Sequence, residues 1–443
     1  MQVSDTLEEF NEGLIRFIGE SPTPFHASKS MAEQLAAAGF TELKESESWT
    51  LVPGERYYLL RNGSSLIAFV YGRESLIDSG IRMLGAHTDS PCLKVKPNAR
   101  VISAGYYQLG VEVYGGVLLS TWFDRDLSIA GRVTFRSANG SPVSRLIDFV
   151  APVAMVPSLA IHLDRDVNRN RSINPQEELR PLLMLADDDP DKFTFPALLL
   201  AQLQKQYPGI EVREILDFEL SLYDTQRPAL IGLRREFIAS ARLDNLLSCY
   251  LGLESILAAK GDQSCLLVCT DHEEVGSASA CGARGPMLDQ FLQRLIPETS
   301  DRLRALDASM MISADNAHGI HPNYRQKHDA EHGPLLNGGP VIKVNANQRY
   351  ATTSETSGLF RLLCDDLGVP VQSFVSRTDM ECGSTIGPIT AAEVGVKTLD
   401  IGVPTFAMHS TRELAGSQDA YALMRVIRAY FARPRAPGRF DGQ

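Results

Sequence analysis

The sequence predicts an α/β protein whose main domain is built on a largely parallel sheet and is interrupted by a β-rich insertion. Continuous apolar runs at 265–270, 308–314 and 396–403 end in polar turns, which is typical of strands buried on both faces of a parallel sheet. A helical pattern covers 243–260. Between about 95 and 235 the pattern changes to alternating, β-like runs. The length of 443 residues exceeds one ordinary core, so two or three domains are expected.

The elements expected before the insertion are two helices and two strands. Helical periodicity covers 7–18 and the segment that begins at Ser28, and Gly39 closes the second helix. Short apolar runs at 66–71 and 81–86 predict strands.

The insertion is placed at 96–235, so the main domain is discontinuous and comprises 1–95 and 236–443. Alternating runs such as 106–116 indicate strands within the insertion. The polar stretch 164–192 predicts a long loop, and loops of that length usually carry a function. The proline- and arginine-rich residues after Phe431 predict a disordered tail.

Composition excludes several classes of protein. A formal net charge of −11 gives no electrostatic support to a nucleic-acid partner. The acidic N-terminal segment lacks the features of a signal peptide, and no run of about 18 apolar residues predicts a membrane span. Seven cysteines without a C-x-x-C pair indicate reduced thiols rather than a disulfide framework. We therefore expect a cytoplasmic protein with no membrane partner.

Polar clusters directly follow the apolar runs. AHTDSP, TDHEEVGS, SADNAHGIHP and MHSTRE each come after a predicted strand or its turn, and RLDN opens a helix. In an open α/β sheet, ligands bind outside the carboxyl ends of the strands. If these strands share one sheet, seven side chains converge there: His87, Asp89, Asp244, Glu273, Glu274, Asp315 and His409.

Histidines and carboxylates without a thiolate suit zinc, manganese or cobalt. Three carboxylates against two divalent ions leave one positive charge, which a bound hydroxide would balance. Asp244 is the candidate for a carboxylate that bridges the two ions. Of the adjacent pair Glu273 and Glu274, one can ligate while the other takes the proton of the water as general base. Asp89 is expected to accept the second ring N–H of His87.

Each residue also has a simpler interpretation. Asp244 alone would be read as a helix N-cap, His409 as a hydrogen-bonded structural histidine, and an adjacent glutamate pair as solvated surface. The joint occurrence of these residues after apolar runs favours the metal site. Rival motifs are weaker: His272 begins an H-E-x-x-H pattern, but Gly276 stands where the second histidine is required. His328 and His332 are four apart, but the turn residues around them favour a loop or pocket wall.

The motifs AHTDSPCLKVKP, RLDNL, DHEEVGS, SADNAHGIHPNY, GPVIKVNANQRYAT and AMHSTRE, in this order, resemble the aspartyl aminopeptidase family over nearly the whole chain. The resemblance implies a phosphorylase/hydrolase-like α/β catalytic domain interrupted by a β-rich dimerisation domain. It also implies a dinuclear zinc-type site with His87 and Asp315 on one ion, Glu274 and His409 on the other, and Asp244 bridging. Glu273 would be the general base, and Asp89 would support His87 as a second catalytic residue.

The resemblance further assigns residues to the substrate. His318, Lys343 and Tyr350 match positions that line the substrate pocket, and His162 matches a histidine of the insertion that reaches the neighbouring subunit's active site. Whether such a histidine contacts substrate or metal stays open. Lys343 is attractive as the partner of an acidic side chain, although a lysine in an apolar run can also extend to solvent. A homododecamer is the implied assembly.

The function expected from this reading is removal of N-terminal residues, preferably Asp or Glu, from peptides by water activated between two metal ions. Zinc is the expected metal, with cobalt or manganese as alternatives. The nearest rivals are an aminopeptidase of neutral specificity and a related deacylase or carboxypeptidase. A rival from a different class is a catalytically silent scaffold, which would be expected to lack a ligand or the base.

Overall fold

The computed structural model describes residues 4–186 and 193–440. The chain forms two compact units. The first comprises Met1–Asp89, Pro228–Met408 and Glu413–Gln443, and the second comprises Ser90–Arg227 and His409–Arg412. The protein is thus a mixed α/β protein with several sheets.

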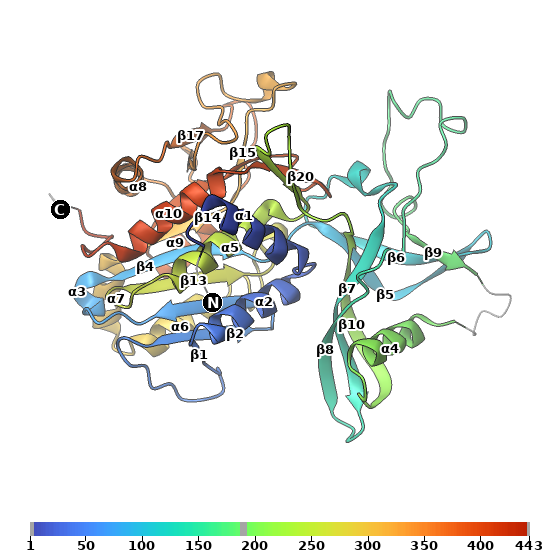
Figure 1. Ribbon diagram of the computed structural model, residues 1–443, viewed down its shortest axis with the longest axis horizontal. Helices are drawn as coiled ribbons and strands as arrows, with labels where there is room; N and C mark the ends of the chain where they lie inside the picture. The colour runs from blue at the N-terminus through green and yellow to red at the C-terminus, as the bar shows by residue number, and fades with distance from the viewer. Residues whose placement is uncertain (1–3, 187–192, 441–443) are drawn as a thin grey trace. The chain divides into compact units, whose positions relative to one another are not determined.

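A nine-stranded sheet forms the centre of the first unit, with the order β1-β2-β3-β13-β4-β14-β18-β16-β17 (Figure 1). The strands are β1 (Thr41–Glu42), β2 (Arg56–Arg61), β3 (Ser65–Val70), β4 (Ile81–His87), β13 (Ser264–Thr270), β14 (Met310–Ala314), β16 (Val341–Val344), β17 (Gln372–Val375) and β18 (Lys397–Gly402). The four neighbours β13, β4, β14 and β18 are parallel, so the parallel arrangement predicted from the apolar runs is confirmed. Their carboxyl ends therefore lie along one edge.

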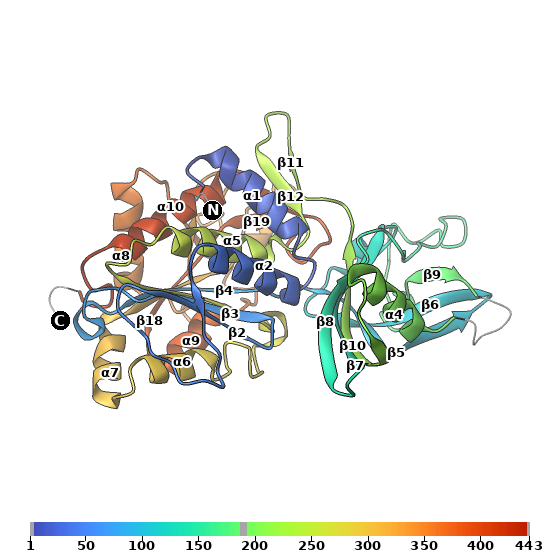
Figure 2. The same cartoon turned by 60° about the horizontal axis from the view of Figure 1, so that its bottom comes forward.

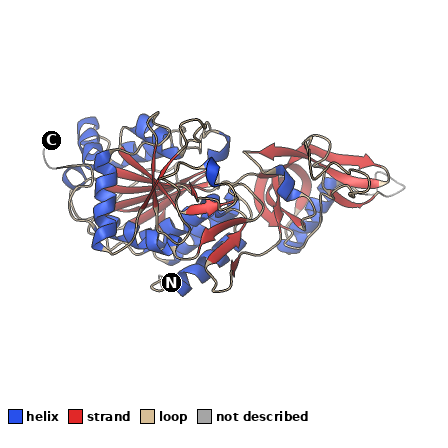
Figure 3. Ribbon diagram, turned by 90° about the horizontal axis from the view of Figure 1, so that it is seen from above, coloured by secondary structure: helices blue, strands red, loops and turns tan. Residues whose placement is uncertain are grey.

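Helices cover both faces of this sheet (Figure 2). One layer holds α1 (Leu7–Gly19), α2 (Pro24–Ala37), α5 (Leu243–Leu257), α8 (Ser354–Asp366) and α10 (Asp419–Ala432); the other holds α3 (Leu76–Ser79), α6 (Met287–Leu295), α7 (Thr299–Ala308) and α9 (Ile386–Val394). Figure 3 shows the strands enclosed between these helices. In β13, Leu267 faces one core cluster and Leu266 and Val268 face the other. Because successive side chains of a strand point to opposite faces, a strand covered on both sides reads as one continuous apolar run.

A smaller sheet of the first unit has the order β11-β12-β20-β19-β15. Its strands are β11 (Ala229–Ile231), β12 (Phe237–Ser240), β15 (Ala317–His318), β19 (Pro404–Phe406) and β20 (Glu413–Gly416). β20 carries Glu413 and β15 carries His318, so this sheet holds two side chains of the site described below.

The second unit is built on a six-stranded sheet with the order β8-β7-β10-β5-β6-β9. Its strands are antiparallel: β5 (Cys92–Ser103), β6 (Tyr106–Tyr114), β7 (Leu127–Ser137), β8 (Pro142–Asp148), β9 (Leu182–Leu185) and β10 (Val212–Asp224). A 3₁₀ turn η1 (Leu119–Trp122) and helix α4 (Phe195–Gln206) complete it. The unit has a hydrophobic core of its own, to which α4 contributes Leu199 and Leu203.

The expectation for the C-terminal tail was wrong for the described residues up to Phe440. The guanidinium of Arg82 is buried and donates to the carbonyl oxygens of Arg433 and Arg435, and Lys397 donates to that of Gly438. These polar contacts hold a segment whose composition alone indicated disorder. Residues 441–443 lie outside the described residues.

Two further expectations concern the whole chain. In the described parts, no helix combines the length and apolar character that crossing a membrane requires. The seven cysteines are all free thiols, as the sequence indicated.

Candidate metal centre

Four of the predicted ligands are brought together at the carboxyl edge of the parallel strands. His87 is the last residue of β4, and Asp315 directly follows β14. Glu274 lies in the 3₁₀ turn η2 (Glu273–Val275), just after β13. Asp244 lies at the start of α5, where its backbone angles are not helical and Arg242 occupies the N-cap position.

The side chains of this cluster are close and shielded from water. Nε2 of His87 lies 3.4 Å from Oδ1 of Asp244 and 3.5 Å from Oδ1 of Asp315. One ligand atom each from His87, Asp244 and Glu274 all lie within 4.8 Å of one another. His87 and Asp244 are buried, with side chains only 1% and 4% exposed. Buried carboxylates at this spacing repel one another unless a cation lies among them.

The ionisation of the cluster reflects this crowding. Burial by itself would lower the pKa of His87, but the carboxylates of Asp244, Asp315 and Asp89 outweigh it and hold that pKa well above its usual value. Burial raises the pKa of Glu273 to about 8, and the neighbouring carboxylates add to this while His87 opposes it. The pKa of His87 reflects a local excess of negative charge, and the same charge adds to the effect of burial on Glu273. The donor set of imidazole and carboxylates fits a divalent metal of the zinc type, and the charge excess is what such an ion would neutralise.

Surrounding residues hold the ligands in place. Glu413 is buried and accepts the backbone N–H of Asp244 at 2.9 Å. The two carboxylate oxygens of Asp89 accept the N–H groups of Glu273 and Glu274, each at 3.1 Å. Asp89 thereby orients the turn that carries both glutamates.

The ring partner of His87 differs in detail from the expectation. Its Nδ1 lies 3.0 Å from the backbone carbonyl oxygen of Asp89 and 3.4 Å from the carboxylate oxygen Oδ1. The main-chain carbonyl is the closer acceptor, while the carboxylate also accepts hydrogen bonds from the turn. The residue is as predicted, but the atom that supports the imidazole is a main-chain one.

Two predicted residues belong to the second unit. His409 has a positive φ of 69°, and its Nδ1 lies 3.0 Å from the carbonyl oxygen of Gly116. A ring held by a backbone carbonyl at Nδ1 presents Nε2 as the ligand atom. His162 is exposed in a segment without helix or strand. Their roles at the metal centre and the substrate stay predictions.

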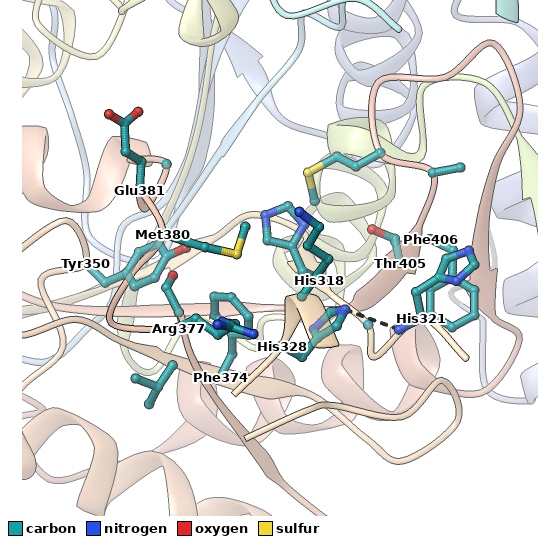
Figure 4. Close-up of a pocket in the computed structure, with 17 residues that line it drawn as sticks. His318, His321, His328, Tyr350, Phe374, Arg377, Met380, Glu381, Thr405 and Phe406 are labelled. Carbon is teal, nitrogen blue, oxygen red and sulfur yellow. Dashed lines mark hydrogen bonds between the residues drawn. The ribbon is translucent and has the colours of Figure 1, made fainter. Parts of the chain in front are cut away.

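A pocket of about 300 Å³ contains two of the three substrate-pocket residues predicted in the first unit (Figure 4). His318 and Tyr350 line it. The other lining side chains include three histidine or aromatic groups and a methionine that sequence reasoning did not select: His321, Phe374, Phe406 and Met380. His321 lies in the motif SADNAHGIHPNY but was not selected from it, and the other three come from segments outside the quoted motifs. His328, which was read as a loop or pocket wall, also lines the pocket and accepts the N–H of His321 at 3.2 Å.

Lys343 lies beneath this pocket rather than in its lining. The residue is only 2% exposed, and its ammonium donates to Oδ2 of Asp315 at 3.1 Å and to the carbonyl oxygen of Asn316 at 3.0 Å. The same ammonium lies 5.2 Å from the centre of the Tyr350 ring. It therefore connects a predicted metal ligand with a pocket wall, and it does not extend to solvent.

A histidine–carboxylate cluster at the carboxyl edge of a parallel sheet is typical of metallohydrolases. Comparison with known families identifies which metallohydrolase family this is: the model of the aminopeptidase I zinc metalloprotease (M18) family matches residues 17–431. The chain belongs to this family and is an aminopeptidase that depends on metal.

Relatives and solved structures agree. The chain is 60% identical over 430 residues to a probable M18 family aminopeptidase 2 of Pseudomonas aeruginosa (strain UCBPP-PA14), covering 97% of this chain and 99% of the relative. It is 58% identical to the protein of the same description from Pseudomonas fluorescens (strain SBW25), covering 97% and 100%. A chain of the Ape4 and Nbr1 complex superposes with a TM-score of 0.92 at 37% identity, covering 97% of this chain and 87% of that one. The S. cerevisiae mApe1 dodecamer gives a TM-score of 0.84 at 27% identity, covering 97% and 98%.

Proposed function

We propose that this aminopeptidase removes N-terminal residues, preferably Asp or Glu, from peptides at a site for two divalent metal ions. The observation that carries the proposal is the cluster of buried His87 and Asp244 with half-buried Glu274 and Asp315, and with Glu273 beside it. His87 and Asp315 would hold one ion, Glu274 and His409 the other, and Asp244 would bridge them. When bound, the ion pair supplies Lewis acidity that polarises the scissile carbonyl and lowers the pKa of the attacking water.

Glu273 is the general base of the proposed reaction. It stands next to a ligand in η2 but is not needed for the ligand set, so its carboxylate is available for proton transfer. Glu273 takes the proton of the attacking water and then gives it to the leaving amine. Because the backbone N–H groups of Glu273 and Glu274 bind opposite oxygens of Asp89, the base and the ligand keep a fixed relation during both steps.

The preference for acidic residues rests on Lys343 and His318. Lys343 places a buried positive charge beside Tyr350, one wall of the pocket, and His318 comes from the adjoining strand β15. A cation in a desolvated setting favours a carboxylate over a neutral side chain. Part of the Lys343 charge is already shared with Asp315. An aminopeptidase of neutral specificity is therefore the alternative to be tested.

We also propose self-association, in which the insertion predicted at 96–235, whose residues up to Arg227 lie in the second unit, acts as the dimerisation domain of a homododecamer. In the loop around His162, the apolar side chains Leu159, Ile161 and Leu163 are 60%, 46% and 74% exposed. Exposed apolar groups at this density mark a contact surface. One solved relative is described as a dodecamer. Covering this loop with a second subunit would bring His162 towards that subunit's substrate, and a mass near twelve chains in sedimentation would support the assembly.

The function is tested by product release from Asp-, Glu-, Leu- and Ala-linked chromogenic substrates. Enzyme stripped by a chelator is reloaded separately with zinc, cobalt or manganese, and N-acetylated versions of the same substrates serve as controls. Metal-restored activity that favours Asp and Glu and is lost on acetylation supports the proposal. Preference for Leu or Ala would overturn the acidic pocket, and activity on the acetylated substrates would point to a deacylase.

A further inference from the structure

We propose that Asp271, His272 and Cys281 form a second metal site, for a thiophilic divalent cation of the zinc class. Sγ of Cys281 lies 3.5 Å from Nδ1 of His272, the ring nitrogen that would share an ion with the thiolate. One ligand atom from each residue lies within 4.8 Å of the other two. A tetrahedral zinc ion separates sulfur and nitrogen ligands by about 3.6 Å, so the thiol and imidazole already have the required spacing. A carboxylate oxygen of Asp271 is the third candidate ligand atom of this group.

The backbone holds these three residues together. The hydroxyl of Ser65 accepts the N–H of Asp271 at 2.8 Å and donates to the carbonyl oxygen of Cys281 at 2.8 Å. This links the two ends of the 271–281 loop through a buried strand residue. Ser279 lies within the loop, with its hydroxyl 2.8 Å from Nδ1 of His272. The ligand spacing is therefore a property of the folded loop rather than of three mobile side chains.

The environment suits an exchangeable ion rather than a structural one. Asp271 and Cys281 are buried, whereas the His272 side chain is 27% exposed and gives solvent access to the ring. Three protein ligands leave one tetrahedral position for water or the Ser279 hydroxyl, as in open zinc sites. The thiolate makes this site softer than the candidate metal centre, whose proposed ligands are imidazoles and carboxylates. Zinc, cobalt(II) and cadmium are the fitting cations.

The second site shares a backbone segment with the candidate metal centre. Asp271 and His272 directly precede Glu273 and Glu274, whose N–H groups are held by Asp89. A cation that draws the Asp271 carboxylate towards His272 and Cys281 would pull on this turn and disturb the position of Glu273. Thiophilic metal in excess of that needed by the catalytic site should therefore lower activity.

Cobalt(II) titration of enzyme stripped by a chelator tests the site without reliance on peptidase activity. A thiolate-to-cobalt charge-transfer band in the near ultraviolet is expected, because cobalt at the candidate metal centre would have no thiolate ligand. C281S should abolish the band, and C92S, which removes a partly exposed thiol of the second unit, should leave it unchanged. H272N should weaken cobalt binding at least about tenfold, since even the outer partners of metal ligands contribute that much.

Activity in the same titration gives a second readout. Inhibition by excess cobalt should be relieved in C281S and retained in C92S. Absence of the band in the unaltered enzyme, or its persistence in C281S, would overturn the site whether or not the enzyme prefers acidic substrates. A folded H272N variant with unchanged cobalt affinity would do the same.

Discussion

Replacing Lys343 with methionine tests whether this lysine attracts the acidic side chain of the substrate or only positions Asp315. Methionine keeps the apolar stem within the buried strand β16 and removes the ammonium that donates to Asp315 and to the Asn316 carbonyl. A hydrogen bond to a charged group contributes about 1.5–3 kcal/mol, which corresponds to roughly 10- to 150-fold in a rate or binding constant. If the ammonium also attracts the acidic side chain of the substrate, that loss falls on Asp and Glu substrates.

We therefore expect K343M to lower kcat/KM for an Asp-linked substrate about 10- to 100-fold more than for a Leu-linked one. Loss of the contact to Asp315 should at the same time weaken retention of metal during dialysis. K397M is the matched control, because Lys397 is half-buried and likewise donates to a backbone carbonyl, that of Gly438, away from the site. An equal loss on Asp and Leu substrates would refute a role in specificity and leave Lys343 as a residue that positions Asp315.

Three further changes have distinct expected outcomes. E273Q should retain metal, measured by elemental analysis, and lose at least about 100-fold in kcat, because general acid–base catalysis contributes about that much or more; full activity would exclude Glu273 as the base. E413A removes the acceptor of the Asp244 N–H and should weaken metal affinity about 10- to 100-fold in a competition titration with a chelator. His26 has a pKa lowered to about 4 by burial and by the nearby cations Lys29 and Arg242, so its contribution to stability is complete above pH 6.5 and is lost as the pH falls towards 4. Denaturant unfolding should show a loss of about 3 kcal/mol over that window, and H26N should flatten it; an unchanged slope would contradict the assignment.

The parallel core was predictable because the signal is local to each strand. In β13, consecutive residues 265–269 face alternate clusters, and each cluster is apolar, so the buried strand shows as an unbroken apolar run. The positions of His87 and Asp315 at strand ends followed from the same runs. Helices α1 and α2 were likewise visible from their periodicity and from Gly39.

Contacts between distant parts of the chain were not predictable. Glu413 supports Asp244 from 169 residues away, and although it lies in a motif that the sequence marked, nothing local gave it that role. The order of the tail depends on Arg82, which is more than 350 residues distant from the carbonyls it binds. A proline- and arginine-rich composition indicates only that a segment does not fold by itself. It does not show whether another segment binds it and keeps it ordered.

The sequence by itself determined the α/β class and the family, and it selected the residues of the candidate metal centre, because apolar periodicity and motif order can be read along the chain. Tertiary structure alone decided which atoms face one another. It placed the carbonyl of Asp89 rather than its carboxylate closest to His87, buried Lys343 against Asp315, and brought Cys281 to His272. The physical reason is that hydrogen-bond geometry and desolvation depend on distances between segments, and these distances exist only once the sheet has formed.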